Sequence, residues 1–135
     1  MEGHMAGDRV LEDAGRTISE VLRETDLGGR VGGDEFEAII VGAGLEDARK
    51  IWNLRLLPQF NSRNVKISAG ASEVDTSSDT TVEESTELAD DAQSKAKIAS
   101  RESHQSEFRT TGDLTKEDIM NRKHLRKMAE RKTAA

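Results

Sequence analysis

The stretch Arg30-Val31-Gly32-Gly33-Asp34-Glu35-Phe36 places two glycines directly before two carboxylates. The apolar run 36–41 follows, so the stretch is predicted to form the tip of a β-hairpin. Glycines at such a tip allow a ligand to approach the backbone closely or allow φ > 0. Two adjacent acids supply the hard oxygen ligands that divalent cations prefer. The pattern indicates a nucleotide triphosphate site, although a turn with two solvated acids explains the same residues.

Composition limits the fold and the compartment. The 135 residues fit one domain, and with 34% hydrophobic and 3% aromatic residues its core is expected to be thin. The absence of cysteine excludes disulfides and thiolate metal sites and fits a reducing compartment. No apolar run approaches the roughly 18 residues of a membrane span, and no signal-peptide segment is present. A soluble, cytoplasmic protein without a membrane span is therefore expected.

Charge is distributed unevenly along the chain. Residues 119–135 carry a net charge of +5, and because the whole chain has −6, residues 1–118 carry −11. An acidic body argues against nucleic-acid binding by that body. The basic tail has the charge to bind nucleic acid or anionic lipid, but a solvated terminal helix is the preferred interpretation.

Hydrophobic spacing predicts the order helix, hairpin, helix, strand, helix, and therefore an α+β layered domain. Asp8 is the expected N-cap of the first helix, and Pro58 is expected to end the second. Gly70, inside the single strand, would permit another backbone to approach closely. The predicted elements after Met1–Gly7 are a helix from Asp8 to about Glu24, the hairpin, a helix from about 45 to 57, a strand over 65–71 and a helix whose apolar positions run from Val82 to Ile98.

Polar stretches divide the rest of the chain. Residues 75–86 are expected to form a solvated loop, and residues 102–114 a linker. Thr115-Lys116-Glu117-Asp118 resembles a capping box, with Asp in place of the usual Glu or Gln. It is expected to open a basic helical tail over residues 115–135.

Four other segments share with the hairpin a resemblance to one family. The segments are Gly3–Leu11 (G-H-x-x-G-D-x-x-L), Arg23–Asp26 (R-x-x-D), Lys66–Ala71 (T-x-S-x-G-x-A) and Ala89–Arg101 (A-D-x-A-L-Y-x-A-K-x-x-G-R). Together with Gly32–Phe36 they resemble the GGDEF family, the catalytic domains of diguanylate cyclases, at that family's spacing. The resemblance implies a GGDEF domain over residues 1–101, with a palm-like sheet of the nucleotidyl cyclase, ferredoxin-like type and flanking helices.

The resemblance also implies an activity. Diguanylate cyclases join two GTP molecules into cyclic di-GMP, a bacterial second messenger. Each 3′-hydroxyl attacks the α-phosphate of the other GTP, so a homodimer is implied. By the same resemblance, Asp34 and Glu35 would hold Mg²⁺ or Mn²⁺, and one of them would help to deprotonate the 3′-hydroxyl. Backbone amides at Gly32 and Gly33 would contact the GTP phosphates.

The remaining site residues follow from the other segments. The resemblance implies that Asp8 accepts from guanine N–H groups and that Lys97 and Arg101 pair with the β- and γ-phosphates. It implies that Arg23 and Asp26 bind the product, cyclic di-GMP, away from the active site.

Plainer interpretations stand beside these roles. The N-cap function alone would explain Asp8, and Lys97 and Arg101, four residues apart, could lie on a solvated helix face. Arg23 and Asp26 could form a surface ion pair of little energetic value. His4 and His104 have no partner cluster and are interpreted as incidental.

The chain also departs from the family pattern. Family members carry a strand with a metal-binding D-x-D-x-F-K pattern before G-H-x-x-G-D, and the segment after that strand carries a guanine-recognising Asn. This chain has only Met1 and Glu2 before Gly3. Lys66, Gln93-Ser94 and Ser100 also differ from the pattern, which suggests relaxed packing. Three interpretations follow: a truncated cyclase with weak or no activity, a non-catalytic cyclic di-GMP receptor using Arg23 and Asp26, or a domain whose missing strand comes from a partner chain or from a swapped element of the tail. The helical pattern of residues 119–132 argues against the swap.

Overall fold

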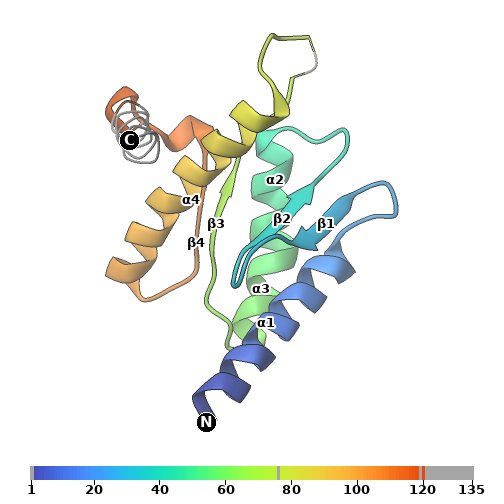
Figure 1. Cartoon of the computed structure of the whole chain (residues 1–135), viewed down its shortest axis with the longest axis vertical. Helices are drawn as coiled ribbons and strands as arrows, with labels where there is room; N and C mark the ends of the chain where they lie inside the picture. The colour runs from blue at the N-terminus through green and yellow to red at the C-terminus, as the bar shows by residue number, and fades with distance from the viewer. Residues whose placement is uncertain (1, 76, 119, 121–135) are drawn as a thin grey trace, which may run out of the picture. The chain divides into compact units, whose positions relative to one another are not determined.

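The structure is a computed structural model that describes residues 2–75, 77–118 and 120 (Figure 1). It divides into two compact units, Met1–Ile67 and Ser68–Ala135, which are described separately below. Helices combine with two small two-stranded sheets, so the predicted α+β class is confirmed. The arrangement is consistent with a truncated palm-like fold. Within the described part of the chain, none of the helices has the length and apolar character needed to cross a membrane.

The first unit opens with α1 (Glu2–Val21). Ala14 of the predicted apolar face is buried at 3% exposure, and Thr17, outside that predicted set, is fully buried, whereas Val10 is 42% exposed. The predicted apolar face is therefore confirmed only in part. The helix begins six residues before Asp8, so Asp8 is an exposed residue inside the helix and the N-cap prediction is wrong. The reason is that Gly7, which suggested a helix start, is tolerated inside a helix at a cost of only about 1 kcal/mol.

The predicted hairpin is present. Strands β1 (Leu27–Arg30) and β2 (Phe36–Ile39) pair antiparallel, with Leu27 opposite Ile39 and Arg30 opposite Phe36. Residues 31–35 form the tip between them. The glycine and acidic residues of the motif therefore lie where the sequence predicted.

The second helical segment does not end at Pro58. It comprises α2 (Leu45–Ile51), the π-helical turn η1 (Trp52–Leu56) and α3 (Leu57–Ser62). The Leu57 amide donates to the Trp52 carbonyl, five residues back, and Pro58 falls in the first turn of α3. A proline lacks an amide hydrogen, which is acceptable in a first helical turn. The segment therefore continues through Pro58.

The core of the first unit lies where this helical segment meets α1. Trp52 and Phe60 are 4% and 1% exposed, and their ring centroids lie 5.9 Å apart. Arg63 follows α3 and donates to the Asp13 carbonyl at 3.3 Å and to the Thr17 hydroxyl, which fastens the end of α3 to α1. The core is small, as the low aromatic content predicted.

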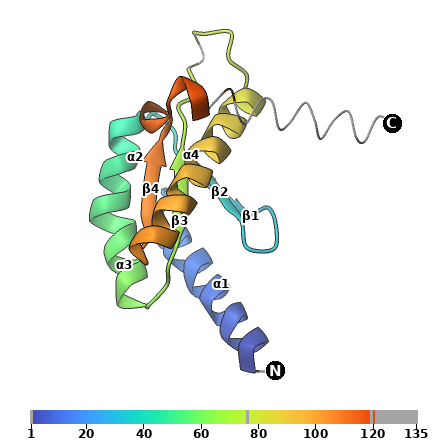
Figure 2. The same cartoon turned by 90° about the vertical axis from the view of Figure 1, so that its left-hand side faces the viewer.

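The second unit is a β–α–β arrangement. Strand β3 (Ser68–Ala71), helix α4 (Val82–Ser103) and strand β4 (Glu107–Thr110) are followed by the 3₁₀ turn η2 (Thr111–Asp113). The two strands pair in parallel, with Ala69 opposite Phe108, and lie side by side in both views (Figure 2). Ala92 and Ala96 of α4 are fully buried.

Two boundaries in this unit differ from the prediction. Helix α4 starts at Val82, inside the predicted loop over 75–86, because Thr81 and Glu84 form a capping box whose two bonds both measure 3.1 Å. The predicted linker over 102–114 contains β4 and η2, so an irregular linker is wrong there. Strand β4 has the largely polar sequence Glu-Phe-Arg-Thr, so hydrophobic spacing did not predict it. Pairing with β3 stabilises the strand.

Helix α4 packs directly on strand β3 at Gly70. A Cβ atom added there would lie 2.2 Å from the Gln93 nitrogen and 2.3 Å from the Ala89 carbonyl oxygen. The predicted close backbone approach at Gly70 is therefore confirmed.

The end of α4 is well packed despite the departures from the family pattern. The Ser100 side chain is buried, and its hydroxyl donates to the Gln105 carbonyl at 2.6 Å, across the turn that follows the helix. Relaxed packing at Ser100 is therefore not observed.

The predicted capping box at the start of the tail is also confirmed. The Thr115 amide donates to the Asp118 carboxylate at 2.7 Å, and the Asp118 amide donates to the Thr115 hydroxyl at 3.1 Å. The rest of the predicted basic helix, residues 119 and 121–135, lies outside the described residues.

Candidate functional site

The hairpin tip is closed by backbone bonds and leaves its two acids exposed. The Val31 and Gly32 amides both donate to the Glu35 carbonyl, at 2.9 and 3.4 Å. Asp34 and Glu35 are exposed, whereas Gly32 is half-buried. The strands therefore present two adjacent carboxylates at a defined turn.

Neither glycine of the tip has a positive φ, and a close approach is seen at Gly32. Among the described glycines, a positive φ occurs at Gly42 alone, where it is 74°. A Cβ atom at Gly32 would lie 3.3 Å from the Glu35 carboxylate, so this glycine leaves room for the acid to fold back over the turn. A Cβ atom at Gly33 would meet nothing within 4 Å. Gly33 is therefore open to an approaching ligand.

The tip has the right type of donors for a divalent cation, but few of them. Asp34 and Glu35 offer carboxylate oxygens, which Mg²⁺ and Mn²⁺ accept. Within the described residues, no group of three or more His, Cys, Asp or Glu side chains is placed to hold a metal. The assignment of Asp34 and Glu35 as metal ligands stays a prediction, and it calls for further ligands from the nucleotide or from other residues.

The other predicted nucleotide contacts lie on helices. Asp8 is exposed on α1 in the first unit. Lys97 and Arg101 are exposed on α4 in the second unit, one helical turn apart and therefore on one face. The structure places Gly32, Gly33, Asp34 and Glu35 at the hairpin tip of the first unit, and Lys97 and Arg101 on one face of α4 in the second unit.

Arg23 and Asp26 form a much more extensive contact than a surface ion pair. The Asp26 carboxylate accepts from the Arg23 amide at 2.9 Å, from Arg23 Nε and Nη2 at 3.2 and 3.1 Å, and from the Val41 amide at 3.0 Å. Arg23 Nη2 also donates to the Val41 carbonyl at 2.6 Å. The Asp26 side chain is only 3% exposed, whereas that of Arg23 is 58% exposed. The pair therefore links the end of α1 to the residues that follow β2.

These bonds favour the charged forms of both side chains. Hydrogen bonds from the Arg23 side chain, and then from its amide, lower the pKa of Asp26 to about 2. The hydrogen bond to Asp26 in turn raises the pKa of Arg23. Asp26 therefore remains a carboxylate far below neutral pH.

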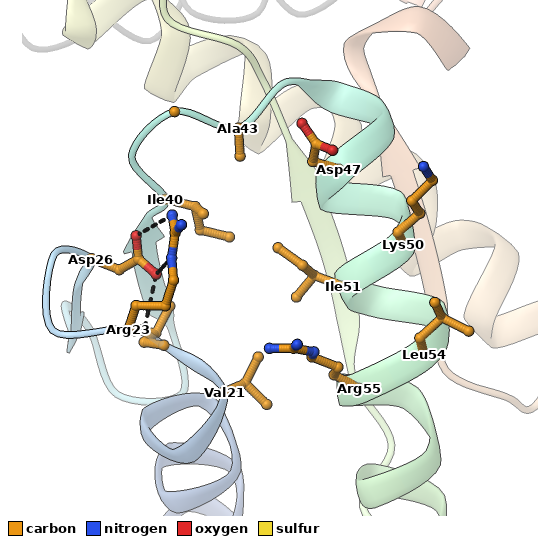
Figure 3. Close-up of a pocket in the computed structure, with 12 residues that line it drawn as sticks. Val21, Arg23, Asp26, Ile40, Ala43, Asp47, Lys50, Ile51, Leu54 and Arg55 are labelled. Atoms are coloured by element: carbon orange, nitrogen blue, oxygen red, sulfur yellow. Dashed lines mark hydrogen bonds and ion pairs between the residues drawn. The ribbon is translucent and has the colours of Figure 1, made fainter.

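An open pocket of about 430 Å³ lies beside this pair (Figure 3). Arg23 and Asp26 line one side, and Ile51 and Arg55 reach into it from the α2–η1 segment. Arg55 was not predicted as a site residue. Its only signal in the sequence was a charged position on the helix with the wide apolar stripe, which ordinarily indicates a solvated side chain.

The chain has an α+β fold, and its hairpin tip exposes two acids directly after two glycines. These are the features that the resemblance to the GGDEF family predicted. The family described as "Diguanylate cyclase, GGDEF domain" matches residues 2–103. The chain belongs to this GGDEF family.

Two curated relatives of the chain are named as diguanylate cyclases, one of them as probable, and a third is uncharacterized. Diguanylate cyclase DgcS of Shewanella oneidensis is 37% identical over 75 residues, which cover 53% of this chain and 25% of the relative. The uncharacterized protein YhcK of Bacillus subtilis is 37% identical over 49 residues, covering 36% of this chain and 14% of the relative. The probable diguanylate cyclase DgcE of Escherichia coli is 39% identical over 49 residues, which cover 36% of this chain and 4% of the relative. The matches thus span a quarter or less of each of these relatives, and no solved structure matches the chain.

Proposed function

We propose that this GGDEF domain serves the condensation of two GTP molecules into cyclic di-GMP. The observation that carries the proposal is the hairpin tip, which exposes Asp34 and Glu35 beside an open Gly33 in a chain of this family. In the proposed reaction, the 3′-hydroxyl oxygen of one GTP attacks the α-phosphate of the other, and pyrophosphate leaves. Two such attacks close the cyclic product.

The proposed roles follow the positions of the side chains. Asp34 and Glu35 would hold Mg²⁺ or Mn²⁺, which would neutralise phosphate charge and make the 3′-hydroxyl more acidic. Asp8 would accept from guanine, and Lys97 and Arg101 would pair with phosphate oxygens. A homodimer would bring two bound GTP molecules together, and the cytoplasm would supply the substrate.

We further propose that residues 1–101 form the GGDEF domain. Residues 115–135 would form a basic extension. No nucleic-acid partner is proposed.

Residues 1–135 by themselves are expected to have weak cyclase activity or none. The family pattern calls for a third acid in the metal site, and the tip provides two. GTP binding and turnover are therefore measured separately. Incubation with GTP and Mg²⁺, followed by chromatography, tests turnover. If no cyclic di-GMP is found, cyclase activity of residues 1–135 is ruled out.

Calorimetry with GTP tests the site itself. Mg²⁺ is expected to tighten GTP binding, and Glu35→Gln is expected to abolish most of that gain. Glu37→Gln is the matched control, because Glu37 is an exposed acid of β2 that lies outside the tip. Binding that ignores Mg²⁺, or an equal loss in both variants, would contradict the proposed metal site.

A second candidate function, a non-catalytic receptor for cyclic di-GMP, is favoured by the pocket at Arg23. The guanidinium groups of Arg23 and Arg55 both border this open pocket. Guanidinium groups bind phosphate through paired hydrogen bonds, and cyclic di-GMP carries two phosphates.

Calorimetry with cyclic di-GMP tests this receptor function. Arg55→Ala is the cleaner variant, because Arg23→Ala also removes the bonds to Asp26 and Val41. Both substitutions are expected to weaken binding, whereas Arg16→Ala, an exposed residue of α1, is expected to leave it unchanged. No binding, or binding indifferent to Arg23 and Arg55, would reject the receptor function.

A further inference from the structure

Arg30, the last residue of β1, binds the backbone of the glycine pair that follows it. Its Nε donates to the Gly32 carbonyl at 3.2 Å and to the Gly33 carbonyl at 3.0 Å. Its Nη2 also donates to the Gly33 carbonyl. One guanidinium group therefore holds two successive carbonyl groups of the tip.

This contact fixes two amide groups as well. A carbonyl and the amide of the next residue belong to one planar peptide unit, and in a trans peptide they point in opposite directions. The described residues contain no cis peptide bond. Because Arg30 holds the carbonyls of Gly32 and Gly33, the amides of Gly33 and Asp34 face away from its guanidinium group.

The amides of the tip therefore fall into two classes. Those of Val31 and Gly32 donate to the Glu35 carbonyl and close the turn. Those of Gly33 and Asp34 are directed outward by Arg30, and the position of a Cβ at Gly33 is open. Successive outward amides form a favourable site for an anion.

We propose that Arg30 is a positioning residue that presents the Gly33 and Asp34 amides to the phosphates of GTP. The inference rests on the proposed function. The resemblance implied that the Gly32 and Gly33 amides contact phosphate, whereas here the Asp34 amide takes the place of the Gly32 amide, which donates to the Glu35 carbonyl. Glycine adopts a wide range of backbone conformations, so a glycine pair without this contact would be free to rotate. Rotation would turn the partly negative carbonyl oxygens toward the phosphates, which repel them.

Substitution of Arg30 tests the inference through GTP affinity in the presence of Mg²⁺. Arg30→Ala is expected to weaken binding by about tenfold or more, because the loss of oriented charge-assisted contacts is of that size. Arg30→Lys is expected to recover only part of the loss, because an ammonium group lacks the planar fork that spans two carbonyls. Methylguanidinium ion added to Arg30→Ala is expected to restore part of the affinity. Arg16→Ala is the control for removal of one positive charge.

Amide resonances provide the readout that a general loss of structure would not reproduce. On titration of the parent chain with GTP and Mg²⁺, the ¹⁵N–¹H signals of Gly33 and Asp34 are expected to move more than those of Val31 and Gly32. In the absence of GTP, Arg30→Ala is expected to shift the Gly33 and Asp34 signals more than Arg16→Ala does.

The outcomes separate this inference from the proposed function. A parent chain that does not bind GTP would refute the proposed function, and the nucleotide role of Arg30 with it. A parent chain that binds GTP while Arg30→Ala binds equally well would overturn the inference alone. Larger shifts at Val31 and Gly32 than at Gly33 and Asp34 would overturn it too.

Discussion

Gly70→Ala is expected to disturb the second unit severely, because the new methyl group has no room. Its carbon would lie 2.2 Å from the Gln93 nitrogen and 2.3 Å from the Ala89 carbonyl oxygen. Contact distances are normally about 3.5 Å or more, so the backbone of α4 would have to move by about 1 Å. Overpacking costs about 1–3 kcal/mol where side chains can adjust. The obstructing atoms here are backbone atoms, so we expect about 3 kcal/mol or more.

Thermal unfolding followed by circular dichroism measures this effect. For a chain of this size, about 3 kcal/mol lowers the Tm by about 10 °C. Gly112→Ala is the control in the same unit, since its Cβ would meet the Thr110 hydroxyl at an ordinary 3.4 Å and its Tm is expected to change little. A Gly70→Ala variant that unfolds at the parent temperature would refute the close packing of α4 on β3.

Three other predictions concern the first unit. The Asp26 carboxylate, with its pKa lowered to about 2 from 3.8, stabilises the folded chain fully above about pH 4 and loses this effect as the pH falls through about 2. The stability advantage of the parent over Asp26→Asn in urea unfolding is therefore expected to shrink from pH 4 to pH 2. Gly33→Ala is expected to change the unfolding free energy by less than about 0.5 kcal/mol, because its Cβ meets nothing within 4 Å, yet to weaken GTP binding in calorimetry. Phe60→Ala, at a side chain that is 1% exposed, is expected to lower the unfolding free energy by about 3–5 kcal/mol in urea.

A different result would contradict each of these three predictions. A parent-to-variant difference that stays constant down to pH 2 would contradict the ionised role of Asp26. Unchanged GTP affinity in Gly33→Ala would show that the ligand does not approach that residue. A loss below about 1 kcal/mol for Phe60→Ala would place its ring outside the core.

Local patterns in the sequence were sufficient for several features. The hairpin at 32–36 followed from glycines between two strand-forming runs, and the close approach at Gly70 followed from a glycine inside an alternating strand. The capping box at Thr115–Asp118 needed only residues three apart. Such features depend on neighbours in the chain, which a sequence displays directly.

The features that were missed depend on contacts between distant residues. Strand β4 forms because β3, some forty residues earlier, offers a parallel partner. The bond between the Val41 amide and Asp26 spans 15 residues, so the sequence suggested only a surface ion pair. Arg55 lines the pocket only because the α2–η1 segment packs beside the end of α1. Neither the secondary-structure propensity of single residues nor the spacing of apolar residues predicts contacts between distant parts of the chain.

The π-helical turn at Trp52–Leu56 has a consequence for comparing this chain with its relatives. A π turn holds one residue more than the α-helical turn it replaces, and each residue rotates a helix by about 100°. The wider turn absorbs this extra residue, so an α-helix with one residue fewer here would keep Phe60 on nearly the same face, toward Trp52. A relative whose helix is α-helical throughout would need a one-residue gap at this point in an alignment. Pro58, which has no amide hydrogen to donate, directly follows this turn in the first turn of α3.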